Sequence, residues 1–309
     1  MTPDTKSTGS QSKETLQEIS WSDYQQFDKR AYQRQYNRSA RGKEVRKKYR
    51  HANSKHITDA VYLSRPIIAI DGEGVNVAGG EHLYILLAIS GVPPLINRDG
   101  LSTLEIVDYL WKNLDADNLN VIYGGSYDFN CWAASLVKDE LRYLYKSGYR
   151  GRPFPYRDYE LRWIKGKGFH ITKEDKTVVI NDVISFFQRS FVQACDEYLG
   201  GNWEGRDIIV REKARRGNFT VEELENVGAY NSLELDRLVD LVNELRIRLN
   251  KVGLRPRLWN SPGAIAAALF LREGVKHHLN RELPDAVSEA ARYAYAGGRF
   301  EMIKYGAVK

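Results

Sequence analysis

Asp71 and Glu73 flank a glycine at the C-terminal end of an apolar run, Ile67 to Ile70, that is typical of a buried strand. Because side chains alternate along extended backbone, both carboxylates project from the same side of the strand. Carboxylates held this close repel each other unless a cation lies between them, which makes the pair a candidate for binding a divalent metal. The alternative is a polar strand end that reaches solvent, and the DxE spacing alone does not exclude it.

Two further carboxylates have the residue types and spacing to join this pair. Asp128 lies in GGSYDFN, directly after a short apolar run that predicts another strand. Tyr230 and Glu234 are four residues apart in YNSLE, so they share one face of the helix predicted there. Each of these side chains taken singly is more often structural than catalytic. Their order along the chain is what favours a site.

The elements that position these residues are strands in the first half and helices in the second. The sequence predicts strands over 65–74, 83–89 and 120–123, and strands or hairpins in ELRWI, GFHIT and TVVINDVISFF. Capping boxes at Ser102 and Thr220 predict helices that run to about residues 114 and 253. Helical spacing also continues through RSFVQACDEYLG and SPGAIAAALFLREGV. This order predicts a mixed α/β domain, with something new beginning near residue 255.

The motifs DGEG, SYDF and YNSLE, in this order, resemble the three exonuclease motifs of family B DNA polymerases, especially the phage, plasmid and protein-primed branch. VVINDVISFFQRSFVQACDEYLG and WNSPGAIAAALFLREGV resemble later parts of the same branch, so the similarity covers about residues 66–309. It implies an α/β fold, with a ribonuclease H-like 3′→5′ exonuclease domain over residues 57–253. A basic N-terminal arm over 1–56 precedes it, and the beginning of a polymerase domain over 254–309 follows.

The resemblance also implies a chemistry. Asp71, Glu73, Asp128 and Glu234 are expected to hold two Mg²⁺ or Mn²⁺ ions, and Tyr230 is expected to orient the attacking water. Two such ions about 4 Å apart activate a water and stabilise the departing 3′ oxygen of a phosphodiester, and hard cations of this kind prefer oxygen ligands. The expected activity is proofreading hydrolysis at single-stranded 3′ ends of DNA.

The C-terminal part, YAYAGGRFE, resembles the passage from exonuclease into polymerase, and the resemblance implies nucleic-acid contacts from Tyr295, Gly297 and Gly298. The sequence contains no motif of the polymerase palm after this segment. We therefore expect either an N-terminal piece of a DNA-directed DNA polymerase or a free-standing exonuclease. Expected partners are primer-template DNA and a protein that primes replication.

Two positions depart from the commonest motifs. Glu234 stands where the third motif usually has Asp, and its extra methylene moves the carboxylate by ~1.5 Å, enough to matter for metal geometry. Asp236 is not a substitute, because it lies ~200° round the helix from Glu234. Gly124 stands where the second motif often has Asn, which puts a substrate contact in doubt. Asp182, among apolar neighbours, is better interpreted as an acid that fixes a loop than as a fifth ligand.

The basic surplus of the chain lies in its first 56 residues, which carry 13 Lys and Arg against 6 Asp and Glu. The remaining residues carry 33 against 34, and the formal net charge is +6. Basic side chains interleaved with tyrosines, including Arg46, Lys47, Lys48 and Arg50, favour a nucleic-acid-binding arm. A solvated charged helix without a ligand is the alternative.

A hydrophobic content of 42% is typical of a soluble globular protein. No apolar run approaches the ~18 residues that span a bilayer, and the N-terminus lacks a signal-peptide pattern. We therefore expect an intracellular protein of the cytoplasm, or of the host cytoplasm if it is phage-encoded, without a membrane partner. Two alternatives to the proofreading nuclease stay open. One is a nucleic-acid-binding module with a weakened active site, and the other is a ribonuclease of the same fold.

Overall fold

The computed structural model of the chain describes residues 58–77, 82–150, 152–215 and 219–274. An eight-stranded sheet forms its centre, in the order β3-β2-β1-β4-β8-β7-β6-β5. The strands are β1 (Ile67–Asn76), β2 (His82–Ile89), β3 (Val92–Ile96), β4 (Leu119–Ile122), β5 (Phe154–Tyr156), β6 (Tyr159–Ile164), β7 (Gly168–Lys173) and β8 (Lys176–Asp182).

The strand order identifies the fold. β1, β4 and β8 are parallel, and β2 is antiparallel to both β1 and β3. Five strands in the order β3-β2-β1-β4-β8, with only β2 reversed, form the sheet of the ribonuclease H-like fold, as expected from the sequence. β7, β6 and β5 extend this sheet as antiparallel hairpins.

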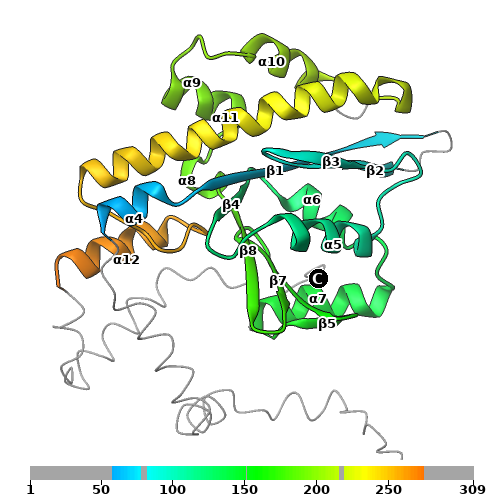
Figure 1. The fold of residues 1–309 in the computed structure, drawn as a ribbon, viewed down its shortest axis with the longest axis horizontal. Coiled ribbons are helices and arrows are strands. Elements are labelled where there is room, and N and C mark those ends of the chain that lie inside the picture. Colours follow the sequence, from blue (N-terminus) through cyan, green and yellow to red (C-terminus); the bar gives the residue numbers. More distant parts are fainter. Residues whose placement is uncertain (1–57, 78–81, 151, 216–218, 275–309) are drawn as a thin grey trace, which may run out of the picture. The chain divides into compact units, whose positions relative to one another are not determined.

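Helices cover both faces of the sheet (Figure 1). The long helix α11 (Leu224–Lys251) crosses over β1 on one face, and α5 (Thr103–Asn113) and α6 (Ser126–Trp132) lie on the other. The remaining helices are α4 (Asp59–Ser64), α7 (Lys138–Arg150), α8 (Ile184–Phe187), α9 (Phe191–Leu199), α10 (Arg206–Ala214) and α12 (Gly263–Arg272). α9 and α10 lie on the outer side of α11, away from the sheet. No helix among the described residues is long and apolar enough to cross a bilayer.

The local signals in the sequence explain where several elements begin. Both capping boxes form, at Ser102 before α5 and at Thr220 before the 3₁₀ turn Val221–Glu223 that leads into α11. The strand expected in TVVINDVISFF is shorter than predicted. β8 stops at Asp182, and the following ISFF forms the helical turn α8.

The main core fills the face of the sheet opposite α11. It joins Ile70, Leu87 and Ile89 of β1 and β2 to apolar side chains of α5, α6 and the β5–β8 hairpins. On the other face, Ala69, Asp71 and Glu73 of β1 point toward α11. β1 thus separates an apolar core from a layer in which carboxylates meet the long helix.

Candidate metal centre

The sheet is open beside the carboxylates of β1. β4 pairs with β1 only from Ile67 to Ala69, whereas β2 pairs with β1 as far as Asn76. The segment from Asp71 to Gly74 therefore extends past the last residue that β4 pairs. Its side chains lie where neighbouring helices approach the sheet.

Asp71, Glu73 and Glu234 form one cluster. A carboxylate oxygen from each lies within 4.8 Å of the other two, although Glu234 comes from α11, far along the chain. Glu73 is 4% exposed and Glu234 is 5% exposed, and Asp71 is half-buried. Three carboxylates at this separation are stable only with nearby positive charge, and an all-oxygen donor set suits Mg²⁺ or Mn²⁺. The residues therefore fit a hard divalent cation.

Two side chains hold the cluster in place from the α11 side. Asn231, fully buried, donates an amide hydrogen to Asp71 Oδ2 over 3.2 Å. Lys213 of α10 forms an ion pair with Glu234 Oε1, and its ammonium also lies 5.1 Å from the centre of the Phe191 ring. Neither residue was predicted from the sequence. Lys213 sits in the charged run VREKARR, which has the composition of a solvated helix face, and only the packing of α10 against α11 brings it to Glu234.

Asp128 lies in the first turn of α6 and is 4% exposed, but it is not part of the three-carboxylate cluster. The Tyr84 hydroxyl donates to Asp128 Oδ1 over 2.9 Å, and Trp132 Nε1 donates to the Tyr84 oxygen over 3.1 Å. Burial and the negative charge of Asp128 raise the pKa of Tyr84 well above its usual range. The hydroxyl therefore stays a neutral donor.

Tyr230 lies one turn before Glu234 on α11 and is 2% exposed. Its hydroxyl has no hydrogen-bond partner among the described residues. An unpaired buried hydroxyl is uncommon and costs free energy, so its retention suggests a ligand or a water at this position. Of the five residues expected at the catalytic site, the structure thus gathers three carboxylates, places Tyr230 on the helix that supplies one of them, and holds Asp128 separately through Tyr84.

Asp182 has the loop-fixing arrangement expected from the sequence. It is buried at the end of β8, and its Oδ1 accepts hydrogen bonds from the backbone N–H groups of Gly124 and Ile184. Burial raises the pKa of its carboxyl, and the backbone donors oppose this rise. Asp182 therefore connects β8 to the start of α6, which carries Asp128.

Replacing Asp182 by Ala is expected to destabilise the protein by ~1–3 kcal/mol, because two part-buried backbone N–H groups lose their acceptor. In a domain of this size this corresponds to a fall in Tm of roughly 2–12 °C in a calorimetric or circular dichroism melt. Asp158→Ala is the control, since the carboxyl of Asp158 is 81% exposed. If Asp182→Ala and Asp158→Ala had the same Tm, the interpretation of Asp182 as a residue that fixes the loop would be wrong.

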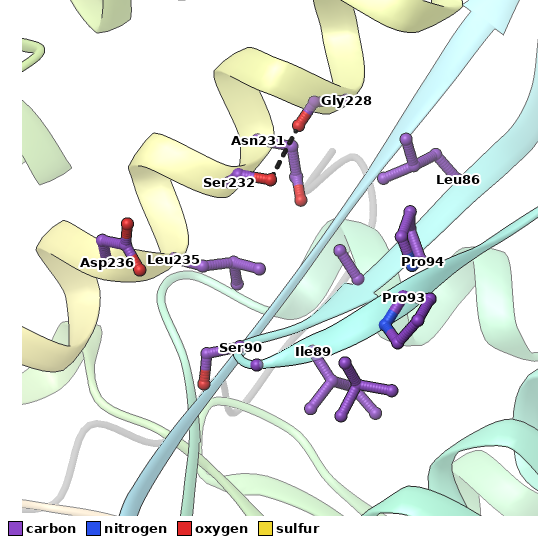
Figure 2. Close-up of a pocket in the computed structure, with 13 residues that line it drawn as sticks. Leu86, Ile89, Ser90, Pro93, Pro94, Gly228, Asn231, Ser232, Leu235 and Asp236 are labelled. Atoms are coloured by element: carbon purple, nitrogen blue, oxygen red, sulfur yellow. Dashed lines mark hydrogen bonds between the residues drawn. The ribbon is translucent and has the colours of Figure 1, made fainter.

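A pocket of about 290 Å³ lies next to the cluster on the same face of the sheet, between α11 and the β2–β3 hairpin (Figure 2). Leu86, Pro93 and Leu235 provide apolar walls, and Asn231 and Asp236 are among its polar residues. Asp236 lines this pocket and is not part of the three-carboxylate cluster, in agreement with the helical spacing. Asn231 is the residue shared by the pocket and the cluster.

Several expected nucleic-acid contacts lie outside the described residues. These are Arg46, Lys47, Lys48 and Arg50 of the N-terminal arm and Tyr295, Gly297 and Gly298 of the C-terminal segment. The arm over residues 1–56 and most of the expected polymerase segment over 254–309 are outside as well. Within residues 254–274, Trp259 is buried and stacks on Tyr62 of α4 at a ring-centre distance of 6.4 Å.

No family model matches the chain, and no curated protein matches it. Among solved structures, the EXO domain of Nibbler from Aedes aegypti is similar at 14% sequence identity, with a TM-score of 0.30. The similarity covers 67% of this chain and 88% of that domain. A TM-score of this size does not establish a common fold, and the fold assignment above rests on the strand order and directions.

Proposed function

We propose that this protein is a metal-dependent 3′→5′ exonuclease that hydrolyses single-stranded nucleic acid from its 3′ end. The observation that carries this proposal is the cluster of Asp71, Glu73 and Glu234, whose oxygens lie within 4.8 Å of one another beside the open edge of β1. The more specific form, the proofreading part of a family B DNA polymerase, is supported by the order of the three motifs in the sequence.

The position of each residue indicates whether it would bind metal, orient the water or hold a ligand in place. Asp71 and Glu73 from β1 and Glu234 from α11 are the groups that would hold divalent metal, with Asp128 contributing from α6. Divalent ions held by these residues would activate a water and stabilise the leaving 3′ oxygen. Tyr230 supplies a hydroxyl from the same helix face as Glu234 to orient that water. Asn231 and Lys213 keep the Asp71 and Glu234 carboxylates in position before any ion binds.

The function is tested with single-stranded oligonucleotides labelled at the 5′ end, incubated with Mn²⁺ or Mg²⁺ or with EDTA. A ladder that shortens from the 3′ end, and its loss in EDTA, are expected. A 3′-phosphorylated oligonucleotide serves as the end-specificity control, and an RNA of the same sequence tests the ribonuclease alternative. Endonucleolytic products, or cleavage that is indifferent to EDTA, would contradict the proposal.

Tyr230→Phe is expected to slow cleavage by about tenfold, corresponding to one lost hydrogen bond of ~1.4 kcal/mol in the transition state. The same substitution is expected to keep or raise the Tm, because it removes a buried hydroxyl that has no partner among the described residues. Single-turnover assays and thermal melts measure the two effects. A lowered Tm with unchanged cleavage would mean that the hydroxyl has a structural partner and no part in the reaction.

One observation favours the second candidate, a nucleic-acid-binding module with a weakened active site. The Lys213 ammonium pairs with Glu234 and supplies positive charge where a metal ion would supply it. Under this alternative the protein binds single strands without cleaving them, and Lys213→Met lowers the Tm without affecting any metal dependence. Under the exonuclease proposal the same substitution leaves a negatively charged site that still binds Mn²⁺.

A further inference from the structure

We infer that Tyr84 is a positioning residue of the metal centre, which holds Asp128 in place through a hydrogen bond made across Gly72. This inference rests on the proposed function, because Asp128 matters to metal binding only if the carboxylates hold metal. Tyr84 is outside all the sequence motifs, and it was not among the residues predicted to act at the site. Three features of the structure carry the inference.

The first feature is a β-bulge in β2. Glu73 pairs with Leu86 and Gly74 pairs with Tyr84, so the pairing skips Ile85. Strict alternation would place Tyr84 on the same face as Leu86, toward α11. The extra residue turns Tyr84 to the opposite face, where it joins the core with Leu87 and points toward α6. Bulges that re-aim a side chain occur often beside active sites.

The second feature is the direction of the hydrogen bonds at the Tyr84 hydroxyl. The Trp132 indole can only donate, and its Nε1 lies 3.1 Å from the tyrosine oxygen. The hydroxyl therefore accepts from Trp132, and its own hydrogen is directed to Asp128 Oδ1 at 2.9 Å. All three side chains are buried. The Tyr84 hydroxyl thus orients the carboxylate of Asp128, and the hydrogen bond from Trp132 holds that hydroxyl in place.

The third feature is the space that Gly72 provides. A Cβ on Gly72 would lie 1.8 Å from the Tyr84 hydroxyl oxygen and 2.7 Å from the backbone oxygen of Leu86. Any side chain at this position therefore displaces Tyr84 or the strand. The glycine between Asp71 and Glu73 is needed because Tyr84 crosses β1 there to reach Asp128.

The experiment is a titration of the whole protein with Mn²⁺ alone, followed by electron paramagnetic resonance of the free ion and without nucleic acid. Tyr84→Phe removes only the hydroxyl and is expected to weaken Mn²⁺ binding by about tenfold, the lower end of the usual effect of a residue that orients a metal ligand. Cleavage by this variant is expected to recover at saturating Mn²⁺, because the ligands themselves are unchanged.

Tyr159→Phe is the matched control. Tyr159 is 7% exposed against 5% for Tyr84, and its hydroxyl also donates to an aspartate, Asp108 Oδ1, over 2.7 Å. Asp108 itself is exposed, so this part-buried bond lies at the edge of the core, away from the metal centre. This variant also loses a tyrosine–aspartate hydrogen bond, and it is expected to bind Mn²⁺ with the affinity of the wild type.

Asp128→Asn completes a double-mutant cycle. If Tyr84 acts through Asp128, Tyr84→Phe weakens Mn²⁺ binding in the wild type and has no further effect in Asp128→Asn. Equal Mn²⁺ affinities for wild type and Tyr84→Phe would overturn the inference and leave the exonuclease proposal intact. The same tenfold loss in both backgrounds would also overturn it, because Tyr84 would then act only on the fold. Wild-type protein that binds no Mn²⁺ would overturn both.

Discussion

Asp71→Asn is expected to reduce metal-dependent cleavage of single-stranded DNA by at least ~10³-fold, because bound metal contributes several kcal/mol of transition-state stabilisation and each ~1.4 kcal/mol is a factor of ten. Asp71 is the member of the cluster that Asn231 holds by a hydrogen bond to Oδ2. An asparagine retains an oxygen that can accept this bond, so the substitution removes charge with little change in shape. Single-turnover degradation of a 5′-labelled oligonucleotide measures the effect.

Stability measurements separate loss of metal binding from loss of fold in this variant. In EDTA, Asp71→Asn is expected to melt no lower than the wild type, since it relieves repulsion among three clustered carboxylates. The rise in Tm that Mn²⁺ causes in the wild type, which reflects binding to the folded state alone, is expected to disappear. Asp236→Asn is the control, because Asp236 lies on α11 outside the cluster and lines the neighbouring pocket. A Mn²⁺-dependent rise in Tm that survives Asp71→Asn would contradict the assignment of this ligand.

Glu234→Asp is expected to lower cleavage by about 100-fold, even though it restores the residue that is commoner in the motif. The structure already brings the longer Glu234 side chain within 4.8 Å of both β1 carboxylates, so α11 lies at the distance that suits glutamate. Shortening the side chain withdraws the carboxylate by ~1.5 Å, and misplacements of about 1 Å cost on the order of 10²-fold in rate. Single-turnover cleavage as a function of Mn²⁺ concentration measures this loss.

Glu234→Gln is the comparison variant, because it separates the effect of charge at this position from the effect of side-chain length. It keeps the length of the side chain and removes its charge, so it is expected to lose metal affinity more severely than Glu234→Asp. Activity of Glu234→Asp equal to or above that of the wild type would show that glutamate at this position is a weakened ligand. The binding-module alternative would then gain support.

The parts of the fold that local sequence determines were predicted well. The run ending in Asp71 and Glu73 forms β1, and the capping boxes at Ser102 and Thr220 open helices at the expected positions. These signals depend on neighbours in the chain, such as a side-chain oxygen that reaches a backbone N–H three residues away. β3 was not predicted, because VPPLI contains two prolines, which lack the N–H of a central strand. Prolines are tolerated there because β3 is an edge strand.

The parts of the site that depend on tertiary contacts could not be read from the sequence. Alternation along β2 assigns Tyr84 to the wrong face, because the skipped residue Ile85 has no signature in HLYILLAI. Lys213 belongs to a charged run, and its contact with Glu234 requires α10 to fold back along α11. Asp128 was expected among the other carboxylates, and its hydrogen bond to Tyr84 on the α6 side of β1 depends on the same bulge.

Locating a bound metal ion is the most direct test of the metal centre formed by Asp71, Glu73 and Glu234. Crystals soaked in Mn²⁺ and measured near the manganese absorption edge locate the ion by its anomalous scattering, independently of any assay. We expect anomalous density between the carboxylates of Asp71, Glu73 and Glu234, within ~2.0–2.4 Å of their oxygens as for hard divalent cations. Density at another site, or none at this cluster at Mn²⁺ concentrations that support cleavage, would contradict it.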